Sequence, residues 1–152
     1  MAPTLQLAFT LHVDLSPSLE FGDTHCGSRR FIPITGGTVE GPKLTATIVP
    51  GGGDWNVLRE DGITHLFAKY TIQSSDGVFI SVTNEGWIRK FRKEAGENGT
   101  KKIPEDQWYA KTSPRFEVQE GVHGWLNRTV FVGELRKPSI PNHVVIDVYS
   151  VE

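Results

Sequence analysis

Glycine and proline divide this chain into short segments that show no helical periodicity. The 16 glycines and 9 prolines are spread along all 152 residues rather than pooled in one linker. Between them lie short apolar runs, and in residues 5–15 Leu, Phe and Val alternate with mostly polar or small residues. A period of two is typical of a strand with one buried face. We therefore expect an all-β chain in which the odd-numbered residues of 5–15 face the core.

Further strands are expected between successive turn signals, of which Asp61-Gly62 and Asp76-Gly77 are typical of hairpins. Hairpin-linked antiparallel strands form either a sandwich or a closed barrel, and closure removes exposed edges. We expect a single domain, residues 1–152, that forms a closed antiparallel barrel of about eight to ten strands around an internal pocket. The predicted strands are 5–15, 30–34, 44–49, 55–58, 63–72, 78–84, 108–112, 115–119, 127–135 and 143–149, with a short helix near 121–126 and an exposed loop at 89–106.

Composition narrows the partners and the location. A formal net charge of −2 gives no electrostatic reason to expect nucleic acid or an anionic membrane as a partner. No segment approaches the ~18 consecutive apolar residues of a membrane helix. The single cysteine, Cys26, cannot form an internal disulfide, so we expect a cytoplasmic location. The five histidines lack the spacing of a metal site, so we expect neither metal nor cofactor. The oligomeric state is left open, a homodimer included.

Two motifs carry most of the chemistry. Arg29 and Arg30 precede a predicted strand, and one of them should face the interior and bind a carboxylate, phenolate or enolate oxygen. In the run PGGGDW at 50–55, the three glycines are able to present N–H groups to an anion. Partial burial beside Trp55 would raise the pKa of Asp54 and make it a proton donor. The structural alternatives are a surface arginine pair and an aspartate that only caps a tight turn.

Three later residues are further candidates for the same site. Glu117 supplies a second carboxyl group and Asn127 a carboxamide, although Glu117 fits an ion pair at the surface equally well. The four tryptophans, Trp125 among them, either fill the core or line a pocket for a flat ligand, where they would stabilise positive charge.

These segments, taken in order, resemble the family called domain of unknown function 3237, or uncharacterised protein family 0311. The resemblance includes GSRRFIPI at 27–34 and VPGGGDW at 49–55, and it continues through 36–42, 61–62, 68–70, 76–77, 84–86, 115–117 and 125–127. It implies a closed antiparallel barrel, lipocalin-like in outline, with a cavity. Some fungal members resemble tailoring proteins of aromatic polyketide pathways, for which stereoselective ring closure is the suggested activity. The charged segment 89–106 departs from many relatives, so the identity of the substrate does not carry over.

The resemblance leads to a functional hypothesis, a cofactor-independent cyclase or isomerase acting on a prenylated phenolic or polyketide metabolite. An alkene would be protonated and a neighbouring phenol oxygen would trap the cation, which is intramolecular hydroalkoxylation. The expected catalytic residues are Asp54, as general acid, and Arg30, which would hold the phenolate or enolate oxygen. The expected substrate-binding residues are Gly53, Trp55, Tyr70, Glu117, Trp125 and Asn127.

Two other functions stay open at this point. A barrel of this size also suits a non-catalytic binding protein for small hydrophobic or aromatic molecules, because a fold does not imply a function. A protein–protein interaction module would need a large exposed apolar patch, which the sequence does not exclude.

Overall fold

The computed structural model describes residues 1–89 and 108–152, and these residues form nine strands and one short 3-10 helix. Most of the loop expected at 89–106 lies outside the described residues. The strands are β1 (Leu5–Leu15), β2 (Leu19–Thr24), β3 (Gly27–Glu40), β4 (Ala46–Leu58), β5 (Ile63–Ser74), β6 (Phe79–Arg89), β7 (Tyr109–Val118), β8 (Phe131–Leu135) and β9 (His143–Val151), and the helix η2 is Gly124–Arg128.

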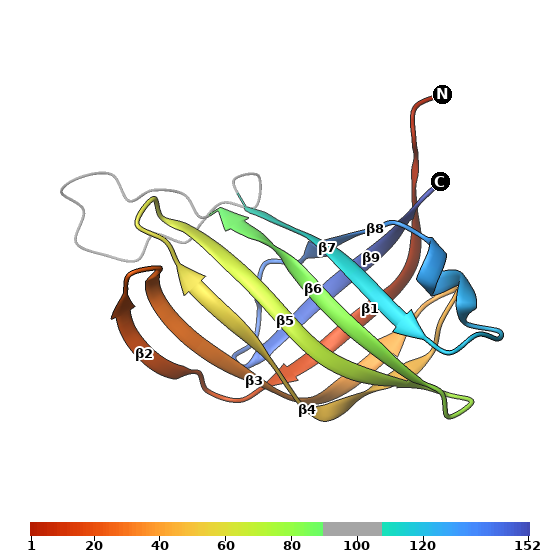
Figure 1. The fold of residues 1–152 in the computed structure, drawn as a ribbon, viewed down its shortest axis with the longest axis horizontal. Coiled ribbons are helices and arrows are strands. Elements are labelled where there is room, and N and C mark those ends of the chain that lie inside the picture. The colour runs from red at the N-terminus through yellow and green to blue at the C-terminus, as the bar shows by residue number, and fades with distance from the viewer. Residues whose placement is uncertain (90–107) are drawn as a thin grey trace.

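The strands close into a barrel, as the sequence led us to expect. Each of them pairs antiparallel with its neighbours in the order β1-β9-β8-β7-β6-β5-β4-β3-β2. Strand β1 also pairs with β3, from Thr10 opposite Glu40 to Leu15 opposite Ile34. This second pairing closes a ring of eight strands, and β2 extends the sheet beyond the first half of β3 (Figure 1). A sandwich is thereby excluded.

Two glycine-containing segments that lie between the strands predicted from the sequence are parts of long strands. Residues 36–37 lie within β3 and residues 51–53 lie within β4. The β3–β4 register shifts between Ile34 and Thr38, and the β4–β5 register shifts between Val49 and Gly53. Irregularities of this kind bend a strand and increase its twist, which lets β3 and β4 curve around the barrel. The glycines of 51–53 thus serve strand geometry, and the loop that would form an anion nest there is absent.

The single inward parity expected for residues 5–15 holds for only part of β1. Phe9, Leu11 and Val13 are buried, whereas Leu5 and Leu7 are 56% and 40% exposed. The pairing of β1 with β9 shifts register between Leu7 and Phe9. Such a shift breaks the strict alternation between core and solvent faces, so Leu5 and Leu7 lie outside the core.

The barrel interior is filled at one end by aromatic rings. The ring of Phe116 lies edge-on to those of Phe9 and Phe131, with centroid separations of 5.6 and 5.0 Å. Trp125, in η2, packs against Phe131 with centroids 5.7 Å apart. Edge-to-face pairs of this kind stabilise a core beyond the area that they bury. The rings therefore plug the η2 end of the barrel, and the open space described below lies at the other end.

Within residues 1–89 and 108–152, no helix has the length and apolar character needed to cross a membrane.

Candidate functional site

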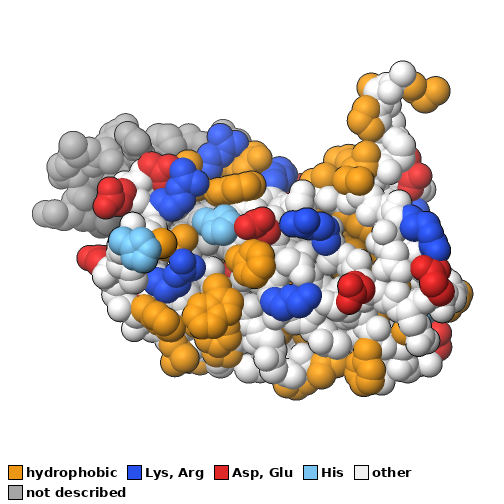
Figure 2. Space-filling view, in the orientation of Figure 1, with side chains coloured by type: hydrophobic (Ala, Val, Ile, Leu, Met, Phe, Trp, Pro, Cys, Tyr) orange, Lys and Arg blue, Asp and Glu red, His pale blue; other side chains and the backbone are white. Residues whose placement is uncertain are grey.

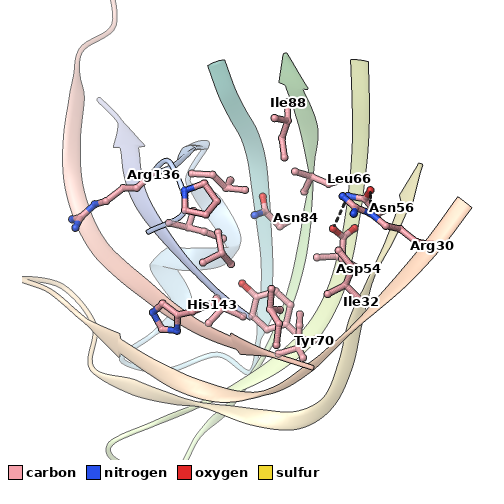
Figure 3. Close-up of a pocket in the computed structure, with 18 of the residues that line it drawn as sticks. Arg30, Ile32, Asp54, Asn56, Leu66, Tyr70, Asn84, Ile88, Arg136 and His143 are labelled. Atoms are coloured by element: carbon pink, nitrogen blue, oxygen red, sulfur yellow. Dashed lines mark hydrogen bonds between the residues drawn. The ribbon is translucent and has the colours of Figure 1, made fainter. Parts of the chain in front are cut away.

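An apolar cavity of about 210 Å³ opens inside the barrel where β1 ends and β9 begins. It is walled by inward-facing side chains from several strands and from the β8–β9 connection (Figure 3). Its apolar lining is Val13, Leu15, Ile32, Ile34, Leu66, Ala68, Ile88, Trp108, Leu135, Pro138, Val144 and Ile146, and its polar lining is Arg30, Asp54, Asn56, Tyr70, Asn84, Arg136 and His143.

Strand alternation explains why the polar groups gather on one wall. Arg30 lies opposite Asn56 in the β3–β4 ladder, and Ile32 lies opposite Asp54. Residues two apart on a strand share a face, so Asp54 and Asn56 both point inward. Arg30 is therefore the inward member of the arginine pair, and Arg29 points outward, where its Nη1 donates to the Trp55 carbonyl oxygen at 3.1 Å.

Arg30, Asn56 and Asp54 form a chain of hydrogen bonds. Nε of Arg30 donates to Oδ1 of Asn56 at 2.9 Å, and Nδ2 of Asn56 donates to Oδ2 of Asp54 at 3.2 Å. The backbone N–H of Phe67, on β5, donates to Oδ1 of Asp54 at 2.8 Å. Asn56 is only 2% exposed, so its carboxamide joins the cation to the acid within the barrel wall.

Burial raises the pKa of Asp54 above the usual value for aspartate, and the hydrogen bonds from Phe67 and Asn56 and the nearby charge of Arg30 offset this only in part. Removal from water disfavours the charged carboxylate, whereas donors and a cation favour it. The balance keeps Asp54 protonated to a higher pH than an exposed aspartate, which is a property of a proton donor.

The other charged groups of the lining turn away from the cavity. In Figure 3 the ends of Arg136 and His143 point outward from the wall opposite Asp54. Arg136 forms a bidentate pair with Asp147 at 2.8 and 2.9 Å, and Nδ1 of His143 lies 2.9 Å from Asp14. Among the described residues of the lining, Asp54 and Arg30 are thus the titratable acid and the cation that remain directed toward the interior.

Small residues leave the space that the cavity occupies. Ala68 lies opposite Asp54 on one side and Asn84 on the other, so only a methyl group separates the two polar residues in that cross-strand row. A Cβ at Gly52 would lie 2.4 Å from Cβ of Tyr70, so the tyrosine packs directly on the β4 backbone. Both features let Asp54, Tyr70 and Asn84 border one space.

Trp55 and Gly53, which we expected to bind substrate, lie on the outer face of β4. Trp55 follows Asp54 and points the opposite way; it is 46% exposed and packs on Phe31 and Phe21, with ring centroids 4.6 and 6.0 Å away. A Cβ at Gly53 would meet the Phe31 ring, so that glycine makes room for the outer cluster. Figure 2 shows hydrophobic side chains gathered over the end of the sheet formed by β2, β3 and β4.

Three other expected substrate-binding residues also lie apart from the cavity. Glu117 is exposed on β7. Asn127 exchanges two hydrogen bonds with the backbone of Val118, at 2.9 and 2.8 Å, and so ties η2 to the end of β7. Trp125 belongs to the aromatic plug, where Lys43 lies over its ring at 5.7 Å. Of the expected site residues, Arg30, Asp54 and Tyr70 are the ones that the fold brings to the cavity.

Asn56, Asn84 and Trp108 line the cavity although none of them is among the expected site residues; Trp108 is one of the four tryptophans for which a pocket-lining role was left open. A signal for Asn56 was present, because it lies two residues after Asp54 on the same strand and must share its face. The indole N–H of Trp108 donates to the Leu135 carbonyl oxygen at 2.8 Å, which fixes an aromatic ring at the cavity wall. Asn84 had no local signal, since it meets Asp54 only through the pairing of β4, β5 and β6.

A second hollow, of about 490 Å³, lies on the surface between β7 and β8, which pair through only two residues each. It is more open than the cavity, and Arg115 is the titratable residue in its lining. Among the described residues, no group of three His, Cys, Asp or Glu side chains is placed to hold a metal ion. The cavity inside the barrel, which has an acid and a cation in its wall, is therefore a better candidate site than this hollow.

Comparison with known proteins places the chain among β-barrels whose chemistry is mostly undescribed. A crystal structure of a conserved protein of unknown function from Rhodopseudomonas palustris matches with a TM-score of 0.85 at 29% identity, covering 100% of this chain and 99% of the other. The crystal structure of a "beta-barrel like protein" from Acinetobacter baumannii gives a TM-score of 0.84 at 27% identity, covering 100% and 98%.

Sequence relatives agree with the structural ones. A UPF0311 protein of Rhodopseudomonas palustris is 32% identical over 160 residues, with 99% of each chain covered. The "Hydroalkoxylation enzyme phnH" of Penicillium herquei is 29% identical over 86 residues, which is 57% of each chain. The sequence model of the family described as "Protein of unknown function (DUF3237)" matches residues 3–151. Because that match spans almost the whole length, this chain belongs to the DUF3237 family.

Proposed function

We propose that this chain is a cofactor-independent cyclase that closes a ring in a prenylated phenol by intramolecular hydroalkoxylation, with Asp54 as the general acid. The observation that carries the proposal is the partly buried Asp54 carboxyl group in the wall of an apolar cavity, joined to Arg30 through Asn56. Its raised pKa favours the form that donates a proton. The activity named for phnH, a distant relative over little more than half of the chain, supports the same reaction class.

The proposed reaction is an isomerisation whose atoms balance without a co-reactant. The Asp54 O–H bond breaks and its proton forms a C–H bond at the less substituted carbon of the substrate alkene. The other alkene carbon becomes a tertiary cation, and the phenol oxygen forms a C–O bond to it. The phenolic proton then returns to the Asp54 carboxylate, so the acid is regenerated.

The remaining parts of the site have distinct roles in this proposal. Arg30 stabilises negative charge on the phenol oxygen as its proton leaves, because a guanidinium donates charge-assisted hydrogen bonds. Trp108 offers an aromatic ring to the transient cation. The apolar wall excludes water, which would otherwise trap the cation as an alcohol, and holds the oxygen near the reacting carbon.

Turnover of an ortho-prenylated naphthol in deuterium oxide tests the proposal. We expect a cyclic ether that is an isomer of the substrate and that carries one deuterium at the carbon protonated by Asp54. Mass spectrometry and NMR detect this deuterium. Asp54→Asn should lower the rate by about 10²–10⁴-fold, the usual contribution of a general acid. Glu60→Gln, in the exposed turn after β4, makes the same carboxyl-to-amide change outside the cavity and should leave the rate unchanged.

Two results would contradict this function. Full activity in the Asp54→Asn variant would remove Asp54 from the reaction. Saturable binding of the naphthol with only unchanged ligand recovered would favour a non-catalytic binding protein for small aromatic molecules.

A further inference from the structure

Two buried oxygen atoms at the cavity wall have no hydrogen-bond partner among the described residues. They are Oη of Tyr70 and Oδ1 of Asn84. The two residues are 5% and 1% exposed, and both line the cavity. Native proteins leave few buried polar atoms unpaired, because each was hydrogen-bonded to water in the unfolded chain. Two of them beside one cavity call for a partner that the described residues do not supply.

The fold brings the two groups together from neighbouring strands. Tyr70 is on β5, two residues from Ala68, and Asn84 lies opposite Ala68 on β6. In Figure 3 the Tyr70 hydroxyl and the Asn84 side chain extend into the space bounded by Asp54 on one side. Asn84 is two strands from Asp54, roughly 10 Å along the sheet. A ligand held at Asp54 therefore reaches Asn84 across the width of β5.

A third unpartnered oxygen lies away from the cavity, in a tightly packed part of the barrel wall. Oγ1 of Thr112 is also buried without a partner. It sits between Gly86 and Gly133, where a Cβ on Gly133 would come within 2.3 Å of it, and Thr112 does not line the cavity. Tight packing leaves no room for a ligand there, so only the Tyr70 and Asn84 oxygens border a space that a ligand can enter.

The hydrogen-bonding capacity of the two oxygen atoms defines which ligand group would pair with them. Oδ1 of Asn84 only accepts, so its partner must donate a hydrogen bond. The Tyr70 hydroxyl is able to donate, and burial raises its pKa, which keeps the phenol protonated. A ligand hydroxyl satisfies both at once, since its O–H donates to Asn84 and its oxygen accepts from Tyr70. An ether oxygen satisfies only Tyr70, and a hydrocarbon satisfies neither.

We propose that Tyr70 and Asn84 form a second binding subsite that recognises a free hydroxyl group on an aromatic ligand. If the proposed cyclase function holds, on which this part rests, the substrate class is a prenylated aromatic compound with a hydroxyl in addition to the one that closes the ring. The cavity of about 210 Å³ has the volume of about seven water molecules at ~30 Å³ each. That volume suits a nucleus of one or two rings.

Fluorescence titration of the full chain with β-naphthol and with its methyl ether tests the subsite. Wild type should bind β-naphthol about tenfold more tightly than the ether, which corresponds to one hydrogen bond of ordinary strength. Tyr70→Phe and Asn84→Leu, which remove the unpaired atoms at similar volume, should each reduce this preference, and the double variant should bring it close to one. Neither variant should lower the melting temperature, because each removes a buried polar atom that has no partner.

Three results would overturn the subsite. The first is a double variant that keeps the full preference for β-naphthol over its methyl ether. If the melting temperature of that variant also falls, Tyr70 and Asn84 have a structural role. The second is loss of the preference in Arg30→Met but not in the double variant, which would move hydroxyl recognition to Arg30. The third is a lack of saturable binding of either probe. A preference that persists without any turnover would uphold the subsite and reject the cyclase, so the two proposals fail separately.

Discussion

Asn56 donates a hydrogen bond of 3.2 Å from Nδ2 to Oδ2 of Asp54, its inward-facing neighbour two residues earlier on β4. Its Oδ1 accepts from Nε of Arg30 at 2.9 Å, so the carboxamide cannot turn over without breaking both bonds. The arginine therefore holds a donor pointed at the acid. That donor lowers the pKa of Asp54 against the larger effect of burial, and it adds to the stronger lowering by the Phe67 N–H.

Replacing Asn56 should raise the pKa of Asp54 further. Asn56→Leu keeps the volume but removes the donor that favours the carboxylate, and burial is left less opposed. The variant should also unfold about 1–3 kcal/mol more easily, because Nε of Arg30 loses its partner in a partly buried position. Carbon-13 NMR titration of the Asp54 carboxyl carbon measures the pKa, and urea unfolding measures the stability. An Asp54 pKa that stays the same or falls would show that Asn56 does not tune the acid.

Asp54 should make the chain less stable as pH rises. Because its pKa is raised above the ordinary value of 3.8, the folded chain binds more protons than the unfolded chain between pH 3.8 and the raised pKa. Through that window wild type should lose free energy of unfolding relative to Asp54→Asn, at up to about 1.4 kcal/mol per pH unit. Urea unfolding of both proteins from about pH 2 to about pH 8 measures the difference.

Asp147 provides a control of opposite sign. The hydrogen bond from Arg136 lowers the pKa of Asp147 below 3.8. Its contribution to stability is therefore present above that pH and is lost as the pH falls through the lowered pKa. On acidification, the free energy of unfolding of wild type should fall relative to that of Asp147→Asn. Relative to that of Asp54→Asn it should rise. Parallel pH curves for the two comparisons would refute the assignment of a raised pKa to Asp54.

The two adjacent arginines should respond differently to the same substitution. Arg30→Met removes a cation at the cavity and should lower kcat/KM for the prenylated naphthol by about 10–100-fold, the cost of losing a hydrogen bond to a charged group. Arg29→Met makes the same change on the outer face, where the guanidinium bonds the Trp55 carbonyl oxygen, and should leave kcat/KM unchanged. Equal losses in the two variants would indicate that Arg30 acts through general stability rather than at the cavity.

Strand periodicity and turn chemistry were enough to predict the fold class and much of the strand set, and closure of β1 on β3 confirms the barrel. They failed where the ladder is irregular. A register shift puts Leu5 and Leu7 outside the core, and curvature carries β4 through three glycines that suggested a turn. Strand β2 was missed because its alternation is short, with only Leu19 and Phe21 as apolar residues, and neither of them faces the core.

The parts of the candidate site that lie close together in the sequence were predictable, and the parts joined only by strand pairing were not. Grouping Asp54 with Trp55 in one pocket conflicts with the period of two of a strand, and the same rule, applied consistently, would have paired Asp54 with Asn56. Arg30 and Tyr70 line the cavity with Asp54, and their roles there stay predictions. Asn84 joins them through the register of three strands, which the sequence of any one strand does not contain.

The adjacent glycines Gly52 and Gly53 give a last test of which face of β4 borders the cavity. A Cβ at Gly52 would lie within 2.4 Å of Cβ of Tyr70 and 2.5 Å of the Lys69 carbonyl oxygen, atoms that cannot move without shifting β5. Gly52→Ala should therefore destabilise the chain by about 1–3 kcal/mol, the usual cost of overpacking, and weaken naphthol binding by displacing Tyr70.

At Gly53 the added Cβ would meet chiefly the far end of the partly exposed Phe31 ring, and a side chain gives way more easily than the β5 backbone does. Gly53→Ala should therefore cost less stability and leave naphthol binding unchanged, so this variant is the matched control. Urea unfolding and fluorescence titration of both variants measure the two effects. Weaker naphthol binding in Gly53→Ala than in Gly52→Ala would mean that the outer face of β4, with Phe31 and Trp55, is the face that meets the ligand.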